Sequence, residues 1–188
     1  MTQSNPLFQA ANPRRKTVNL DGCPAELKPW LLDRGSLTAK LKRHSGGQFR
    51  VQVLSQRLAA PTLNERRRLG MKSGHWALVR EVVLLGHEQA WVFARSLVPL
   101  ASLTGRLRQL RWLDSRPLGE FLFGQPDLER EPLEVARLSP SGGYAPAELQ
   151  QDQVLWARRS VFRLNDRALL VGEVFLPDFL TPLKPSCN

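Results

Sequence analysis

The stretch His75–Leu100, "HWALVREVVLLGHEQAWVFARSLVPL", decides the fold. It contains two runs rich in β-branched, aromatic and other apolar residues, separated by "GHEQ". This pattern predicts an antiparallel β-hairpin with a loop of about four residues. Both faces of the first run are mostly apolar, so we expect a central strand covered on both sides.

A second hairpin is predicted over residues 153–177, with its turn at Asn165–Asp166. Upstream, residues 49–55 alternate as a strand does, and residues 24–46 have helical spacing interrupted at Gly35, after which Ser36 caps a second helix. A polar connection with one helical turn is expected at 62–74, short helical segments at 103–110 and 117–124, and one further strand at 132–138. Strands joined mainly by hairpins, with a few helices, indicate an α+β domain built on an antiparallel sheet.

Three charged residues interrupt otherwise apolar strands. Arg80 lies in "ALVREVVLL", Arg95 in "WVFARSLVP" and Glu173 in "LLVGEVFLP". An unpaired charge is costly to bury, so each of these groups needs a partner. One interpretation is a buried arginine–glutamate pair that holds the sheet together. The other is a ligand site, because an enclosed guanidinium presents forked donors that suit a carboxylate.

Length and composition indicate one domain. The chain has 188 residues, 42% of them hydrophobic, and we expect a flexible arm over 1–20, the domain over 21–180 and a tail over 181–188. The sequence has no apolar run of the roughly 18 residues that a membrane span needs, and its start lacks a signal peptide's apolar segment. A cytoplasmic monomer is therefore expected. Cys23 and Cys187 are expected to be reduced, although one disulfide between them stays open.

The net charge of +10 restricts the classes of partner. A basic balance suggests a nucleic acid, an anionic surface or an anionic small molecule. The basic groups are spread along the chain and mixed with acids, and the aromatic residues lie inside apolar strands. A nucleic-acid interface would have basic and aromatic residues interleaved on one face, so a nucleic-acid partner is disfavoured. The sequence also lacks phosphate-binding glycine loops, a nucleophile elbow and zinc-site spacings.

Several segments, in order, resemble the chorismate pyruvate-lyase family. They are "WLLDRGSLTAKLK", "WALVREVVLL", "ARSLVPLASLTG", "RPLGEFLF" and "RRSVFRLNDRALLVGEVFLP", within residues 24–178. The resemblance implies a single six-stranded antiparallel sheet with helices packed on it and an enclosed ligand cavity. It also implies a lyase that converts chorismate to 4-hydroxybenzoate and pyruvate for ubiquinone biosynthesis, with no cofactor and no metal.

The resemblance assigns roles to four positions. Arg80 matches the family arginine that holds the ring carboxylate, and Glu173 matches the glutamate that faces the ring hydroxyl. Leu118 matches a residue whose backbone N–H helps to bind the carboxylate end. Leu37 falls where many members have methionine, which matters little if that contact is made through the backbone.

The sequence leaves open which residue binds the side-chain carboxylate of chorismate and what Glu173 does. Arg95 and Arg159 are secondary candidates for the side-chain carboxylate of chorismate. Whether Glu173 is an acid/base or only a hydrogen-bond partner does not follow from the sequence. Because aromatisation supplies much of the driving force, the protein needs mainly to position and desolvate the substrate.

Two other classes of function are weighed against the lyase. The first is a non-catalytic sensor of small aromatic acids, since the same fold serves as the effector-binding domain of some bacterial transcription regulators. Residues 1–20 have no helix-turn-helix pattern, which disfavours this class. The second is a nucleic-acid-binding module, which would show strong salt-dependent binding.

Overall fold

The fold is described from a computed structural model, over residues 8–10, 19–140, 144–149 and 152–180. Most of the predicted arm (1–20), the whole of the predicted tail (181–188) and Cys187 lie outside these residues. Cys23 is a buried free thiol. No helix in the described ranges is long and apolar enough to cross a membrane.

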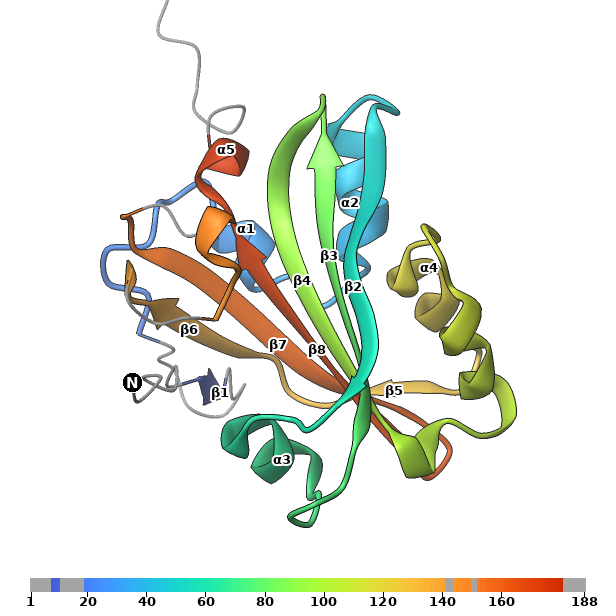
Figure 1. Cartoon of the computed structure of the whole chain (residues 1–188). Helices are drawn as coiled ribbons and strands as arrows, with labels where there is room; N and C mark the ends of the chain where they lie inside the picture. The colour runs from blue at the N-terminus through green and yellow to red at the C-terminus, as the bar shows by residue number, and fades with distance from the viewer. Residues whose placement is uncertain (1–7, 11–18, 141–143, 150–151, 181–188) are drawn as a thin grey trace, which may run out of the picture.

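One antiparallel sheet forms the centre of the molecule (Figure 1). Its strands run in the order β1-β6-β7-β8-β4-β3-β2, and β5 pairs with β7. The strands are β1 (Gln9–Ala10), β2 (Phe49–Ala59), β3 (Ala77–Gly86), β4 (Gln89–Pro99), β5 (Leu128–Arg130), β6 (Glu134–Leu138), β7 (Leu155–Leu164) and β8 (Arg167–Phe175). The expected α+β class is confirmed. The six longer strands match the expected number, and the short β1 and β5 join them.

The helical elements connect and cover the strands. They are α1 (Lys28–Leu31), α2 (Leu37–His44), α3 (Leu63–Leu69), η1 (Leu100–Ser102), η2 (Gly105–Trp112), α4 (Leu118–Phe123), η4 (Ala147–Leu149) and α5 (Pro177–Leu180). As predicted, Ser36 caps α2, with its side chain accepting a hydrogen bond from the Ala39 N–H. The segment expected to have one helical turn forms the longer α3, because Thr62 and Glu65 make a capping box at its start.

The β3–β4 hairpin differs from the prediction in its loop. His87 and Glu88 both have positive φ angles, of 52° and 62°, and the chain turns within these two residues rather than four. The pairing register then shifts between Leu84 and Leu85. This β-bulge inserts one extra residue into β4, which changes the face of the sheet on which all later β4 side chains lie.

The β7–β8 hairpin turns at Asn165–Asp166, as predicted. Asn165 has a φ of 52°, a conformation that asparagine tolerates better than most residues. The two-residue loop sets Leu164 opposite Arg167, and the same unbroken register sets Arg158 opposite Glu173. Opposite residues in an antiparallel pair share one face of the sheet, so these two charges are neighbours.

Two apolar clusters cover one face of the sheet and leave a polar strip between them. Side chains from α1, α2 and α5 form the first cluster, which includes Trp30 and Phe179. Side chains from η2 and α4 form the second, which includes Leu107 and Leu122. The register places the polar strip on the sheet between the clusters, and its members are Arg80, Ser96, Arg158, Ser160 and Glu173.

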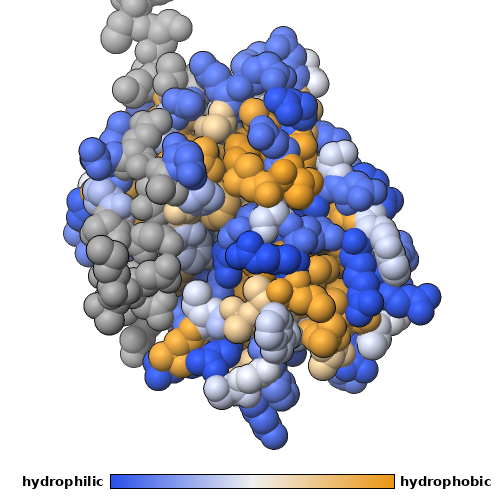
Figure 2. All heavy atoms as spheres, viewed as in Figure 1, coloured by the Kyte–Doolittle hydropathy of each residue, from blue (hydrophilic) through white to orange (hydrophobic). Residues whose placement is uncertain are grey.

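The opposite face carries α3 and a network of ion pairs. Leu69 of α3 packs near the buried Val79 and Leu97, while Arg95 pairs with Glu65 and Glu81. The surface in Figure 2 shows hydrophilic and hydrophobic areas alternating over the β2–β4 side of the sheet. The hydrophilic surface is therefore not continuous in this view.

Candidate active site

A cavity lies between the sheet and the helices α2 and α4. The space between its walls that no atom fills, open solvent at the mouth included, is about 560 Å³. Its floor consists of side chains from five neighbouring strands and its roof of residues from the two helices. The lining residues are Leu37, Thr38, Val51, Arg80, Val82, Leu84, Ala94, Ser96, Leu118, Gly119, Leu122, Phe123, Phe162, Val171 and Glu173. The predicted Arg80, Glu173, Leu37 and Leu118 thus come together at one mostly apolar cavity.

Arg80 is a buried cation with neutral partners. Its side chain donates to the Gln56 Oε1 at 3.1 Å and to the backbone carbonyls of Asp114 at 2.6 Å and Arg116 at 3.3 Å. Burial lowers its pKa, and the charge of Asp114 opposes this only in part. No carboxylate of the described residues lies within ion-pair distance of Arg80. The guanidinium therefore lacks a counter-ion at the edge of the cavity.

Glu173 forms an ion pair with Arg158, not with Arg80. The Arg158 Nε lies 2.6 Å from Glu173 Oε2, and the Arg158 side chain is only 1% exposed. Its Nη1 donates to the carbonyls of Trp30 at 2.6 Å and Asp33 at 2.8 Å. The expected buried arginine–glutamate pair exists, but sequence reasoning did not single out this arginine. Its register with Glu173 across the Asn165–Asp166 turn was the signal that could have identified it.

Glu173 keeps one oxygen for a ligand. Only Oε2 is engaged by Arg158, while Oε1 makes no hydrogen bond within the described part of the chain. The residue lines the cavity, with its side chain 15% exposed. Oε1 is therefore an acceptor that a hydroxyl in the cavity can use.

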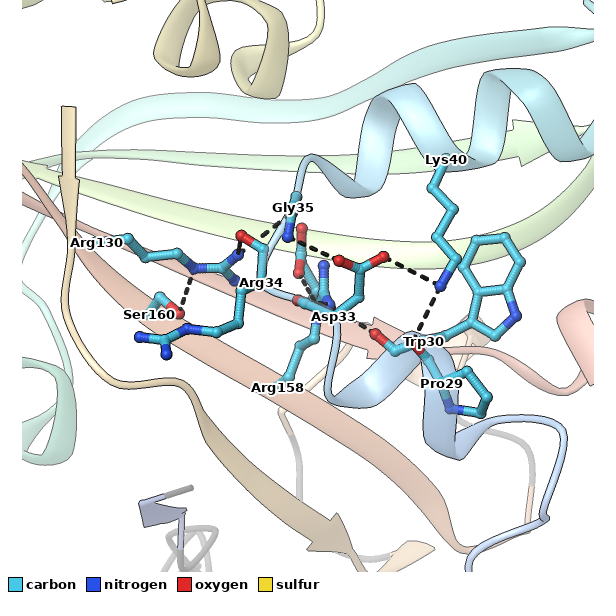
Figure 3. Close-up of polar contacts among 10 residues, drawn as sticks. Pro29, Trp30, Asp33, Arg34, Gly35, Lys40, Arg130, Arg158 and Ser160 are labelled. Carbon is cyan, nitrogen blue, oxygen red and sulfur yellow. Dashed lines mark hydrogen bonds and ion pairs between the residues drawn. The ribbon is translucent and has the colours of Figure 1, made fainter. Parts of the chain in front are cut away.

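A further arginine, Arg130, is partly buried and lies near Arg158 (Figure 3). Its Nε donates to the Ser160 Oγ at 2.9 Å, and its Nη1 donates to the carbonyls of Arg34 at 2.6 Å and Gly35 at 3.3 Å. Burial lowers its pKa to about 10. Its guanidinium lies 5.0 Å from the ring centroid of Phe162, which lines the cavity. Sequence reasoning missed it because "DLERE" is a polar segment with no apolar strand pattern.

The segment between α1 and α2 is held over these arginines. Figure 3 shows Asp33 accepting from the Gly35 N–H and facing Lys40, which also donates to the Pro29 carbonyl. The pKa of Asp33 is lowered: burial opposes the shift, but the Gly35 and Lys40 contacts outweigh it. These contacts fix the position of the first turn of α2 at the cavity.

The roof brings two helix starts together. Leu37 and Leu118 are the first residues of α2 and α4, and the first N–H groups of a helix have no partner within it. A Cβ at Gly119 would lie 2.7 Å from Thr38 Oγ1, so a larger residue there would force Thr38 or α4 to shift. The first turns of α2 and α4, with Leu37 and Leu118, therefore meet at the cavity.

Arg95 and Arg159 do not line the cavity. Arg95 binds Glu65 and Glu81, and Arg159 binds Glu134 and Asn64, all on the opposite face of the sheet. The bulge in β4 is the reason for Arg95: without it, a two-residue loop would set Arg95 opposite Arg80, but the structure sets Ser96 there. Arg159 follows Arg158 on one strand, so it points to the other side.

The comparisons with known proteins identify the family. A family model described as chorismate lyase matches residues 10–182. The chain belongs to the chorismate lyase family. A protein named "Probable chorismate pyruvate-lyase" from Aromatoleum aromaticum is 44% identical over 165 residues, which cover 84% of this chain and 88% of that protein. A protein of the same name from Thiobacillus denitrificans is 43% identical over 163 residues, with coverages of 85% and 87%.

Solved structures share the fold of this chorismate lyase family member. PhnF from Mycobacterium smegmatis has a TM-score of 0.55 at 16% identity. The match covers 78% of this chain and 66% of the PhnF chain. A GntR family transcriptional regulator from Bacillus cereus has a TM-score of 0.53 at 14% identity, with coverages of 70% and 93%. At such low identity the likeness concerns the fold alone. No group of three or more potential metal ligands occurs among the described residues.

Proposed function

We propose that the protein is a chorismate pyruvate-lyase that forms 4-hydroxybenzoate and pyruvate without a cofactor. The observation that carries the proposal is the cavity with Arg80 and Glu173 in its wall, one a cation without a counter-ion and the other a carboxylate with a free oxygen. Family membership supports the same substrate. The product is an aromatic acid suited to serve as the ring precursor of ubiquinone.

The reaction needs positioning more than a reactive group. The ether bond between ring carbon 3 and the enolpyruvyl oxygen breaks, and its electrons leave with enolpyruvate. Ring carbon 4 loses its proton, the ring becomes aromatic, and enolpyruvate gains a proton to become pyruvate. Because aromatisation drives these changes, a dry cavity that holds the substrate in one orientation accelerates them.

The residues divide this task between two ends of the ring. Arg80 and the N–H groups of Leu37 and Leu118 bind the ring carboxylate, since a guanidinium fork and unused backbone donors both suit an anion. Glu173 Oε1 accepts a hydrogen bond from the hydroxyl on ring carbon 4. In this position Glu173 is also the nearest base to the proton that leaves the same carbon.

The direct test adds chorismate to the purified protein in the presence of EDTA. We expect equal amounts of 4-hydroxybenzoate, measured by absorbance, and pyruvate, measured through lactate dehydrogenase. Absence of both products would contradict the proposal. If calorimetry then showed tight binding of 4-hydroxybenzoate without turnover, the sensor class would replace the lyase.

A further inference from the structure

The region around the cavity carries more positive charge than its carboxylates balance. Three guanidinium groups belong to it, those of Arg80, Arg130 and Arg158. Glu173 balances Arg158 through the 2.6 Å ion pair. Among the residues that the structure describes, no carboxylate lies within ion-pair distance of Arg80 or Arg130. Arg80, which is buried, and Arg130, which is partly buried, therefore have no carboxylate in ion-pair contact.

We propose that Arg130 binds the enolpyruvyl carboxylate of chorismate, an inference that rests on the proposed function. Chorismate has two carboxylates, and Arg80 accounts for the one on the ring. A buried cation without a counter-ion is costly, and a ligand carboxylate removes that cost. Two such cations match a substrate with two negative charges.

The strand order places Arg130 on the correct side of Glu173. Neighbouring strands run β3-β4-β8-β7-β5, so Arg80 on β3 and Arg130 on β5 lie on opposite sides of Glu173 on β8. In chorismate, the enolpyruvyl ether is on the ring carbon next to the one that bears the hydroxyl. With the ring carboxylate at Arg80 and the hydroxyl at Glu173, the ether extends past Glu173 toward β7 and β5.

Arg130 also has donors that a carboxylate can take. Its Nη2 makes no hydrogen bond within the described ranges, and its Nη1 is held only by the carbonyls of Arg34 and Gly35. Hydrogen bonds to a charged acceptor are about twice as strong as those to a neutral one. The Arg130 guanidinium lies 5.0 Å from the ring centroid of Phe162, which lines the cavity, so one side chain separates it from the ligand and must move for the carboxylate to reach it.

The test compares ligands with one and two carboxylates. Arg130→Met removes the charge and keeps an unbranched, flexible side chain. We expect its KM for chorismate to rise roughly 10- to 100-fold, the effect of losing a charged hydrogen bond. Its Kd for 4-hydroxybenzoate, which has only the ring carboxylate, should stay within about threefold, a change smaller than one such bond. Arg130→Lys should recover part of the loss.

The matched control is Arg163→Gln. Arg163 lies on β7 and pairs with Glu131, so this variant removes one charge close to Arg130 but on the other face of the sheet. It should behave as the wild type with both ligands. Equal weakening of both ligands in Arg130→Met would assign Arg130 a structural role and overturn the inference, as would no change in either.

A measurement on the wild-type protein tests the same inference if Arg130→Met fails to fold. The probes are 4-hydroxybenzoate with a carboxymethoxy group on ring carbon 3, and the methyl ester of that group. The dianion should bind at least roughly tenfold more tightly than the ester; equal affinity would overturn the inference. If the wild type neither converts chorismate nor binds 4-hydroxybenzoate, the proposed function itself fails, which is a different result from equal affinity of the two probes.

Discussion

Arg80 is buried among neutral oxygen atoms, and this arrangement has a measurable consequence. Its partners are the Gln56 side chain and two backbone carbonyls, which leave the guanidinium without a negative charge. A carboxylate ligand supplies that charge. We predict that Arg80→Gln weakens 4-hydroxybenzoate binding roughly 10- to 100-fold by calorimetry. The control is Arg106→Gln, which breaks the contacts of a partly exposed arginine with Asp127 and Gln125, outside the cavity lining, and should bind normally. Unchanged affinity in Arg80→Gln would contradict the binding of the ring carboxylate by Arg80.

Glu173 is at the other end of the proposed ligand, and two substitutions separate its roles. Glu173→Gln keeps a hydrogen-bond acceptor but cannot take a proton, whereas Glu173→Ala removes both functions. If Glu173 is the base, we expect kcat to fall about 100-fold or more in both variants. If it only orients the hydroxyl, Glu173→Gln should retain most of kcat. Single-turnover rates with chorismate measure the difference, and wild-type rates in Glu173→Ala would exclude either role.

How much of this site follows from the sequence depends on the register of single residues. Arg80 and Glu173 are conspicuous because each interrupts an apolar strand. Arg158 required one more step, counting back from a two-residue turn, and that turn was predicted correctly. Arg130 could not be found in this way. Its segment is polar, and only the pairing of β5 with β7 makes it partly buried.

At the scale of elements, the approach of α4 to α2 depends on Gly119. A Cβ there meets Thr38 Oγ1 at 2.7 Å, and such overpacking costs about 1–3 kcal/mol. Gly119→Ala should therefore lower the melting temperature and weaken 4-hydroxybenzoate binding, because the two helix starts separate. Adding Thr38→Ala removes the clashing oxygen and should restore part of both. If the double variant had the same melting temperature and affinity as Gly119→Ala, the contact between Gly119 and Thr38 would not determine the position of α4.

The opposite face of the sheet predicts a contrasting result for Arg95. Its partner Glu65 is only 2% exposed, so Arg95→Met leaves a buried carboxylate without its cation. Breaking one side of such a pair costs about 3–5 kcal/mol. We expect a large loss of stability in urea unfolding but an unchanged 4-hydroxybenzoate Kd for the folded protein. If folded Arg95→Met bound 4-hydroxybenzoate more weakly than the wild type, Arg95 would have a role in ligand binding.

Arg95 also shows where sequence reasoning about elements reached its limit. The hairpin was predicted from composition, and its existence is confirmed. Its bulge was not predicted, because an extra residue in β4 leaves no mark in a run where both faces are apolar. One inserted residue exchanges the faces of all side chains beyond it. The cavity therefore contains Ser96 where simple counting places Arg95.

For the whole molecule, the net charge of +10 matters before the substrate reaches the cavity. Chorismate is a dianion, and a positive protein field raises its rate of encounter. Salt screens this field, with a Debye length of about 10 Å at 0.1 M. We predict that kcat/KM for chorismate falls roughly 3- to 10-fold as the NaCl concentration rises from about 20 to about 300 mM.

Salt should leave kcat unchanged. Once chorismate is bound, its charges face Arg80 and Glu173 in an enclosed cavity, and buried pairs are screened much less than exposed ones. Salt should therefore act on KM alone. Arg108→Glu, a reversal at an exposed position of η2, should flatten the salt dependence without changing kcat. A kcat that falls in parallel with kcat/KM would instead mean that salt loosens the cavity itself, because steering acts only on encounter.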